Sequence, residues 1–119
     1  MKFGHIGFSV HDLQKSKEFY EEALIPIGLS LTHESNEQVR FGKDGKTMLY
    51  IHARTTPPSS FHLAFEAESH EEVDAFYAAA LAAGGTDHGA PGIRSDYSPT
   101  YYAAFVLDPN GHNIEVVCR

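Results

Sequence analysis

The sequence predicts an α+β fold made of two copies of a strand–helix–three-strand (βαβββ) module. The main observation is an internal repeat: the residue pattern of positions 5–28 recurs at positions 62–85. In each copy an alternating apolar pattern, typical of a strand, runs into a stripe of apolar residues with helical spacing. Three further strand patterns follow each helix pattern. Two such modules account for nearly the whole chain.

The two repeated strands place a histidine on the face opposite the predicted helices. In residues 5–10, apolar side chains alternate with His5 and two small residues, and residues 62–67 repeat this pattern around His62. The apolar stripe of the second helix consists of Val73, Phe76, Tyr77, Ala80 and Leu81. Strand and helix are expected to bury these apolar faces against each other. The histidine face carries small or polar neighbours, so it has room for a ligand.

The first module is expected to span residues 1–54. Asp12 can cap its helix, and Pro26 with Gly28 can end it. Asp44-Gly45 has the residues of a tight hairpin turn. The three strands after the helix are expected at 29–35, 38–42 and 47–53. A segment rich in proline, serine and threonine, residues 55–60, is the expected linker.

The second module is expected to span residues 61–119, and the two modules together form one domain of residues 1–119. Ser69 and Glu72 have the spacing of a helix capping box, and Gly84-Gly85 can end that helix. Residues 84–100 are rich in glycine and proline, so they read as an irregular segment that hides at most a short strand. Strands are expected at 101–107 and 113–118, joined by a turn over 108–111.

Composition excludes several classes of partner. The 119 residues carry a net charge of −7, and their nine basic residues form no cluster. This balance argues against nucleic acid and against an anionic membrane surface as partners. A single cysteine, Cys118, rules out an internal disulfide, and no apolar run has the length of a signal peptide core or a membrane span. We expect a cytoplasmic protein that acts on a small molecule.

The closing strand pattern contains a carboxylate, Glu115, with aliphatic residues on both sides. A buried carboxylate costs several kcal/mol unless a cation or hydrogen-bond donors meet it. His5 and His62 lie on strands of the same sheet face, and two imidazoles with one carboxylate are a common ligand set for iron, manganese or zinc. We therefore expect His5, His62 and Glu115 to bind one divalent metal. The role of His52 stays open, and the histidines expected at the surface are His11, His33, His70, His88 and His112.

These motifs resemble a known family. The openings His5-Ile6-Gly7-Phe8 and His62-Leu63-Ala64-Phe65, with the closing residues 108–115 (Asp-Pro-Asn-Gly-His-Asn-Ile-Glu), are similar to the vicinal oxygen chelate superfamily of glyoxalases, bleomycin-resistance proteins and extradiol dioxygenases. The resemblance implies a U-shaped mixed sheet around a metal site, and a homodimer. It implies the same three ligands, and zinc, nickel, manganese or Fe(II) as the metal.

The resemblance also bears on the reaction. Glyoxalase I has a second glutamate on its fourth strand, and the best match here is Tyr50, with Leu49 or His52 possible under another alignment of the hairpin. The function implied is a metal-dependent enzyme with glyoxalase-like lyase or isomerase chemistry on a small oxygen-bearing substrate. The alternatives are an extradiol-type dioxygenase using Fe(II), and a dimeric protein that binds a drug or other small molecule without catalysis.

Five further residues are expected at the substrate. Arg94 can bind a substrate carboxylate or phosphate, and Tyr97, Tyr101 and Tyr50 can line the site. Tyr102 is expected to supply a phenol as proton donor, so the expected catalytic residues are Glu115, Tyr102 and Arg94. The competing interpretation is that the tyrosines pack a dimer interface and that Arg94 pairs with Asp96.

Overall fold

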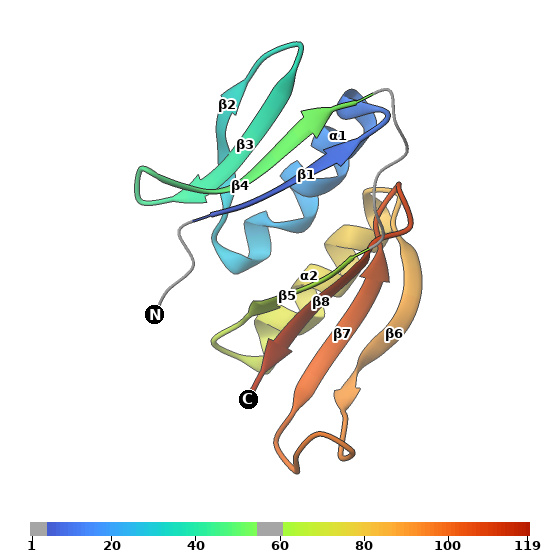
Figure 1. The fold of residues 1–119 in the computed structure, drawn as a ribbon. Helices are drawn as coiled ribbons and strands as arrows, with labels where there is room; N and C mark the ends of the chain where they lie inside the picture. Colours follow the sequence, from blue (N-terminus) through green and yellow to red (C-terminus); the bar gives the residue numbers. More distant parts are fainter. Residues whose placement is uncertain (1–4, 55–60) are drawn as a thin grey trace.

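The computed structural model describes residues 5–54 and 61–119, so the expected linker, residues 55–60, lies outside the described residues. The chain follows the expected order of elements (Figure 1). The first module contains β1 (Ile6–Val10), α1 (Leu13–Ala23), a short 3-10 helix η1 (Ile25–Ile27), β2 (Ser30–Glu34), β3 (Gln38–Lys43) and β4 (Lys46–Ala53). The second contains β5 (His62–Glu66), α2 (His70–Ala82), β6 (Thr86–Ile93), β7 (Tyr102–Leu107) and β8 (Asn113–Cys118). The α+β fold of two βαβββ modules is confirmed.

Each module forms its own four-stranded mixed sheet. The strand orders are β1-β4-β3-β2 and β5-β8-β7-β6, so the two sheets have the same topology. In each, the first strand runs parallel to the last, and the other neighbours are antiparallel. Strands β1 and β5 are the edge strands at which the two modules approach each other.

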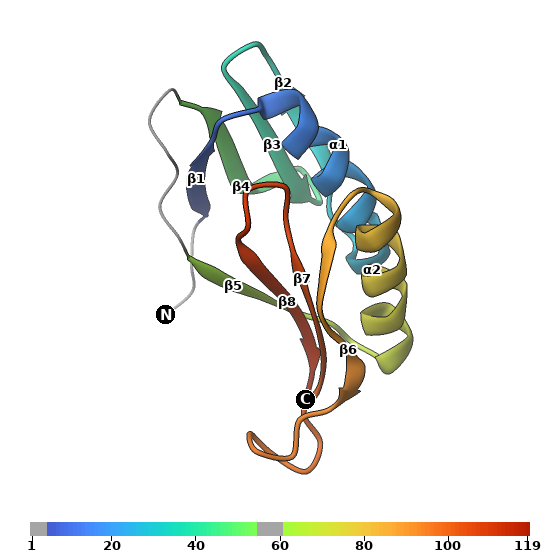
Figure 2. The same cartoon turned by 90° about the vertical axis from the view of Figure 1, so that its right-hand side faces the viewer.

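The two helices pack together and cover one side of the sheets (Figure 2). Fully buried aromatic side chains from both helices, Phe19, Tyr20 and Phe76, join aliphatic residues of all the central strands in a single core. Burying such side chains is the main source of stability for a chain of this size. The opposite side of each sheet is left for the histidine face predicted from the repeat.

Local signals in the sequence explain where the elements begin and turn. The Asp12 carboxylate accepts a hydrogen bond from the Lys15 backbone N–H at 3.0 Å, and Ser69 does the same for Glu72 at 3.2 Å. Asp44 and Gly45 both have positive φ, which the tight hairpin between β3 and β4 requires.

Strand β6 is longer than the short strand expected within 84–100. It runs for eight residues although it contains Gly89, Pro91 and Gly92. The strand lies at a sheet edge, where it needs only one partner, and its register with β7 shifts on both sides of Gly89. Edge position and bulges are the conditions under which strands tolerate proline and glycine.

The expectation that His112 lies at the surface is wrong. Its side chain is 2% exposed and sits against Phe8 and Phe61, while its Nδ1 lies 3.0 Å from the buried Asp108 carboxylate. Tyr20 of α1 donates to the same carboxylate at 2.5 Å, so this cluster ties the first module to the β7–β8 turn of the second. No helix within 5–54 and 61–119 is long and apolar enough to span a membrane.

Candidate functional site

Glu115 lies in the middle of the second sheet and faces away from the helices. Its strand, β8, runs between β5 and β7, and its side chain is only 4% exposed. Parallel pairing of β5 with β8 sets His62 beside Asn113 and Ala64 beside Glu115. This register brings the His62 Nε2 atom to 3.0 Å from the Glu115 Oε1 atom. His62 and Glu115, two of the three side chains that the sequence places on this face, therefore lie within hydrogen-bond distance of each other.

The second ring nitrogen of His62 fixes what can lie between this histidine and Glu115. Nδ1 is 3.0 Å from the carbonyl oxygen of Asn113, and because a carbonyl only accepts, Nδ1 must carry a hydrogen and donate it. In the neutral ring Nε2 then has a lone pair, which would face a carboxylate oxygen directly. This contact is favourable only if a positive species, a proton or a metal ion, lies between the two atoms.

Tyr101 holds the other oxygen of the carboxylate. Its hydroxyl donates a hydrogen bond to Oε2 of Glu115. Burial, followed by this hydrogen bond and the negative charge of Glu115, raises the pKa of Tyr101 to about 12, so the phenol stays protonated at neutral pH. The ring of the exposed Tyr97 lies 4.9 Å from that of Tyr101. Tyr101 thus orients Glu115 and leaves Oε1 directed at His62.

Arg94 lies on the same side of the second sheet, above Phe105. Its guanidinium carbon is 5.4 Å from the Phe105 ring centre, and one Nη donates to the Ala90 carbonyl at 2.6 Å. A Cβ at either Gly89 or Gly92 would approach the guanidinium to 3.1 Å, so the missing side chains make space for it. The His62 ring lies 6.3 Å from the same Phe105 ring. Arg94 has no ion pair with Asp96 among the described residues.

Tyr102 is directed to the opposite side of the sheet. Its hydroxyl donates to the Asp74 carboxylate of α2 at 2.6 Å, and its ring stacks on His70 at 3.9 Å. The buried Ala104 and Val106 of the same strand share this side, as the alternation of a strand requires. The structure does not bring the Tyr102 hydroxyl to Glu115.

The sheet of the first module has a face equivalent to the His62–Glu115 face, but it carries different side chains. Gly7 pairs with Tyr50 where, in the second module, Ala64 pairs with Glu115. Since Gly7 and Ala64 are equivalent in the repeat, the register makes Tyr50, rather than Leu49 or His52, the counterpart of Glu115. The His5 ring lies 4.7 Å from Tyr50. A phenol therefore takes the place of a second carboxylate.

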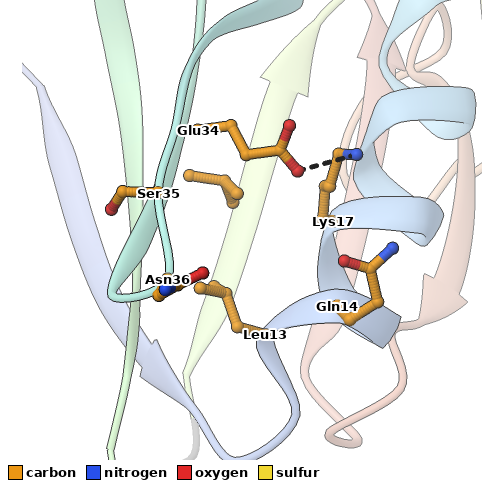
Figure 3. Close-up of a pocket in the computed structure, with 7 residues that line it drawn as sticks. Leu13, Gln14, Lys17, Glu34, Ser35 and Asn36 are labelled. Carbon is orange, nitrogen blue, oxygen red and sulfur yellow. Dashed lines mark ion pairs between the residues drawn. The ribbon is translucent and has the colours of Figure 1, made fainter.

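Two clefts border these elements. An apolar groove of about 220 Å³ runs between the edge strands β1 and β5, and His5 and Met48 line it on the β1–β4 side. A more polar cleft of about 370 Å³ lies between α1 and the β2–β3 hairpin (Figure 3). It contains the ion pair of Lys17 with Glu34 at 2.9 Å. No histidine lines this second cleft, and neither does Glu115.

Comparison with known proteins identifies the family. A sequence model of the Glyoxalase/Bleomycin resistance protein/Dioxygenase superfamily matches residues 2–116. The chain is also 31% identical to a glyoxalase/bleomycin resistance protein from Albidiferax ferrireducens, with 98% of each chain covered and a TM-score of 0.84. This chain belongs to the glyoxalase/bleomycin resistance/dioxygenase superfamily.

More distant members of the superfamily share the fold alone. The fosfomycin resistance protein FosX from Listeria monocytogenes is 20% identical, with a TM-score of 0.75 and coverage of 100% of this chain and 93% of that one. A lactoylglutathione lyase from Agrobacterium tumefaciens is 17% identical, with a TM-score of 0.73 and coverage of 98% and 92%. None of the curated proteins matches the sequence.

Two of the three expected metal ligands, His62 and Glu115, lie side by side among the described residues. Two ligand atoms at neighbouring corners of an octahedral ion with bonds of about 2.1 Å stand about 3.0 Å apart, which fits the His62–Glu115 separation. The buried Oδ1 of Asn113, two residues before Glu115 on the same strand, has no hydrogen-bond partner among the described residues. Within 5–54 and 61–119 of one chain, however, no three metal-binding side chains come together. His5 therefore stands apart from the pair.

Proposed function

We propose that this chain is a divalent-metal-dependent enzyme that performs glyoxalase-like lyase or isomerase chemistry on a small oxygen-bearing substrate in the cytoplasm. His5, His62 and Glu115 would hold the metal. The observation that carries this proposal is the close approach of His62 Nε2 to Glu115 Oε1 while Nδ1 is committed to a carbonyl. That arrangement needs a positive species between the two side chains, and a divalent ion fits the spacing.

The proposed enzyme is a homodimer whose sites lie between chains. In one chain the two histidine faces belong to two separate sheets, and His5 forms no ligand group with His62 and Glu115. A two-fold symmetric dimer can set the first module of one chain against the second module of its partner. Each of two equivalent sites would then receive His5 from one chain and the His62–Glu115 pair from the other. The exposed apolar side chains Met48 and Tyr97 on these faces support burial by a second copy.

The residues around this site have separate roles in the proposed reaction. When bound, the metal ion supplies Lewis-acid polarisation of a substrate oxygen. Tyr101 keeps Oε2 of Glu115 hydrogen-bonded and so fixes the plane of the carboxylate. Arg94 is held flat against β6 and can bind an anionic part of the substrate. Tyr50 can donate a hydrogen bond from its hydroxyl, but it cannot serve as the second carboxylate of a two-glutamate proton shuttle.

Elemental analysis of the purified protein tests this proposal. We expect about one divalent metal per chain after loosely held ions are removed, and loss of that metal in His62→Ala and in Glu115→Ala. His33→Ala, at an exposed histidine of β2, is the matched control and should keep the metal. Iron in the wild type would favour oxygen chemistry, whereas zinc, nickel or manganese would favour lyase or isomerase chemistry. A protein that takes up no metal would contradict the proposal and favour the non-catalytic binding protein.

A further inference from the structure

The first module carries a cluster of basic and aromatic side chains that the proposed metal site does not explain. The register of the two sheets makes Arg40 on β3 the counterpart of Phe105 on β7, because Arg40 pairs with Tyr50 and Phe105 pairs with Glu115. The first module therefore has an arginine and a phenol where the second has an aromatic ring and a carboxylate. We call Arg40, Tyr50, His5 and His52 the Arg40–Tyr50 cluster.

Contacts within the cluster hold Arg40 in a defined place. Its guanidinium carbon lies 5.0 Å from the centre of the Tyr50 ring, and its Nε donates to the Gln38 side-chain oxygen at 3.1 Å. The His52 ring is nearly parallel to the Tyr50 ring at 6.4 Å, and the His5 ring lies 4.7 Å from the Tyr50 ring at an interplanar angle of 59°. Stacking on an aromatic ring and one fixed hydrogen bond preorganise the guanidinium fork.

The terminal N–H groups of Arg40 and the neighbouring Tyr50 hydroxyl are available for hydrogen bonding. Among the described residues, neither Nη atom of Arg40 has a hydrogen bond or an ion pair, and the Tyr50 hydroxyl has no hydrogen bond. Both side chains are only partly exposed, so the electrostatic attraction between Arg40 and a bound anion would be stronger than at an open surface. Arginine presents two parallel N–H groups that match the two oxygens of a carboxylate or phosphoryl group.

We propose that Arg40 and Tyr50 bind an oxyanion group of the substrate, a carboxylate or a phosphoryl group, beside the metal site. This inference rests on the proposed function, since His5 belongs both to the cluster and to the proposed ligand set. Arg40 donates two hydrogen bonds from its Nη atoms to the oxyanion, and the Tyr50 hydroxyl donates a third. The substrate is therefore a small organic anion rather than a neutral molecule.

Ion pairing with a partner chain is the competing role for Arg40. The proposed dimer sets this cluster opposite the β5–β8 face, which carries the carboxylates of Glu66 and Glu115. Both carboxylates already have partners, because Glu66 pairs with Arg119 at 2.8 Å and Glu115 contacts His62 and Tyr101. The free fork of Arg40 is better matched by an anion that arrives with the substrate.

Binding of three probes of similar shape tests this inference. Propionate and ethylphosphonate carry the two kinds of oxyanion, and propionamide is an uncharged analogue of propionate. Each is titrated into the metal-loaded and the metal-free protein while the side-chain Nε–H NMR signals of the arginines are recorded. We expect at least one anion to move the Arg40 signal in both forms, and propionamide to bind at least about tenfold more weakly. The tighter anion identifies the group as carboxylate or phosphoryl.

Variants separate this role from the alternatives. Arg40→Gln should weaken anion binding at least about tenfold, and Arg40→Lys should weaken it less because it keeps the charge without the fork. Arg119→Gln, which removes an exposed and already paired arginine, should leave binding unchanged. Metal content should be the same in all of these proteins.

The outcomes distinguish failure of this inference from failure of the proposed function. Anion binding that is unchanged in the Arg40 variants, or that occurs only in the metal-loaded protein, overturns the inference. The proposed metal site is not affected by either result. Weakened dimer association in Arg40→Gln with unchanged anion binding also overturns it and assigns Arg40 to the interface. Anion binding that depends on Arg40, in a protein that takes up no divalent metal when one is offered, overturns the proposed function alone.

Discussion

Replacing Tyr101 with phenylalanine removes one oxygen atom and leaves the Glu115 carboxylate with one partner fewer. The carboxylate is 4% exposed, so water cannot easily replace the lost donor. A hydrogen bond to a buried charged group contributes about 1.5–3 kcal/mol, and we expect Tyr101→Phe to lower the free energy of unfolding by about that amount. For a domain of this length the melting temperature should fall by roughly 5–12 °C.

The same substitution should change how stability depends on pH. The pKa of Tyr101 is about 12 in the folded protein, above the value near 10 of a free tyrosine. Because the folded-state pKa is raised, the stabilisation is fully present below pH 10 and is lost as pH rises from 10 towards 12. Tyr101→Phe should therefore lose less stability than the wild type over this interval.

Urea and thermal unfolding of the metal-free protein, followed by circular dichroism between pH 7 and pH 12, measure both effects. Tyr97→Phe is the matched control, because Tyr97 is 67% exposed and its ring, which the substitution keeps, lies 4.9 Å from the Tyr101 ring. A Tyr101→Phe protein as stable as this control, with the wild-type pH dependence, would show that the phenol does not hold Glu115.

Three further predictions concern the fold that supports the site. Gly85→Ala should destabilise the protein by about 2–3 kcal/mol in urea unfolding, because the new Cβ would lie 2.5 Å from a Val106 methyl and 2.7 Å from the Phe19 ring. In the control Gly45→Ala the new Cβ meets nothing within 4 Å, so the free energy of unfolding should fall by only about 1 kcal/mol, because Gly45 has a positive φ. Equal losses of stability in the two variants would refute the packing argument. Ser69→Ala should cost about 1 kcal/mol by removing the α2 cap, against no change for Ser95→Ala at an exposed position. Tyr20→Phe should cost about 1.5–3 kcal/mol, since it removes a donor to the buried Asp108 carboxylate, and an unchanged melting temperature would contradict the link between modules.

Much of the fold could be predicted from the sequence because the signals are local. Alternating and helical apolar patterns, two side-chain caps and the Asp44-Gly45 turn each specify a few residues without reference to the rest of the chain. Strand β6 was harder to predict, since glycine and proline weaken a strand unless it lies at an edge. The place of His112 directly after a turn predicts an exposed side chain, yet the turn folds back and buries it against Phe8 and Phe61.

The candidate site could be predicted only in part. Pairing of His62 with Glu115 follows from the repeat and from the position of β8, and strand alternation alone places Tyr102 with Ala104 and Val106 on the helix side. The partners of Tyr101 and Arg40 depend on the register between strands far apart in sequence, which no local pattern specifies. The separation of His5 from the other two expected ligands is likewise a property of how whole sheets are placed.

A subunit-mixing experiment tests most directly the central claim that each metal site is shared between two chains. His5→Ala and His62→Ala proteins are each stripped of metal, mixed in equal amounts, unfolded, refolded together and reloaded. Each protein alone should bind no metal at the site. In the mixture, half of the dimers would contain one chain of each kind and one intact site, so we expect about a quarter of a metal ion per chain. Metal absent from the mixture, when the wild type refolded in the same way binds about one ion per chain, would contradict the claim.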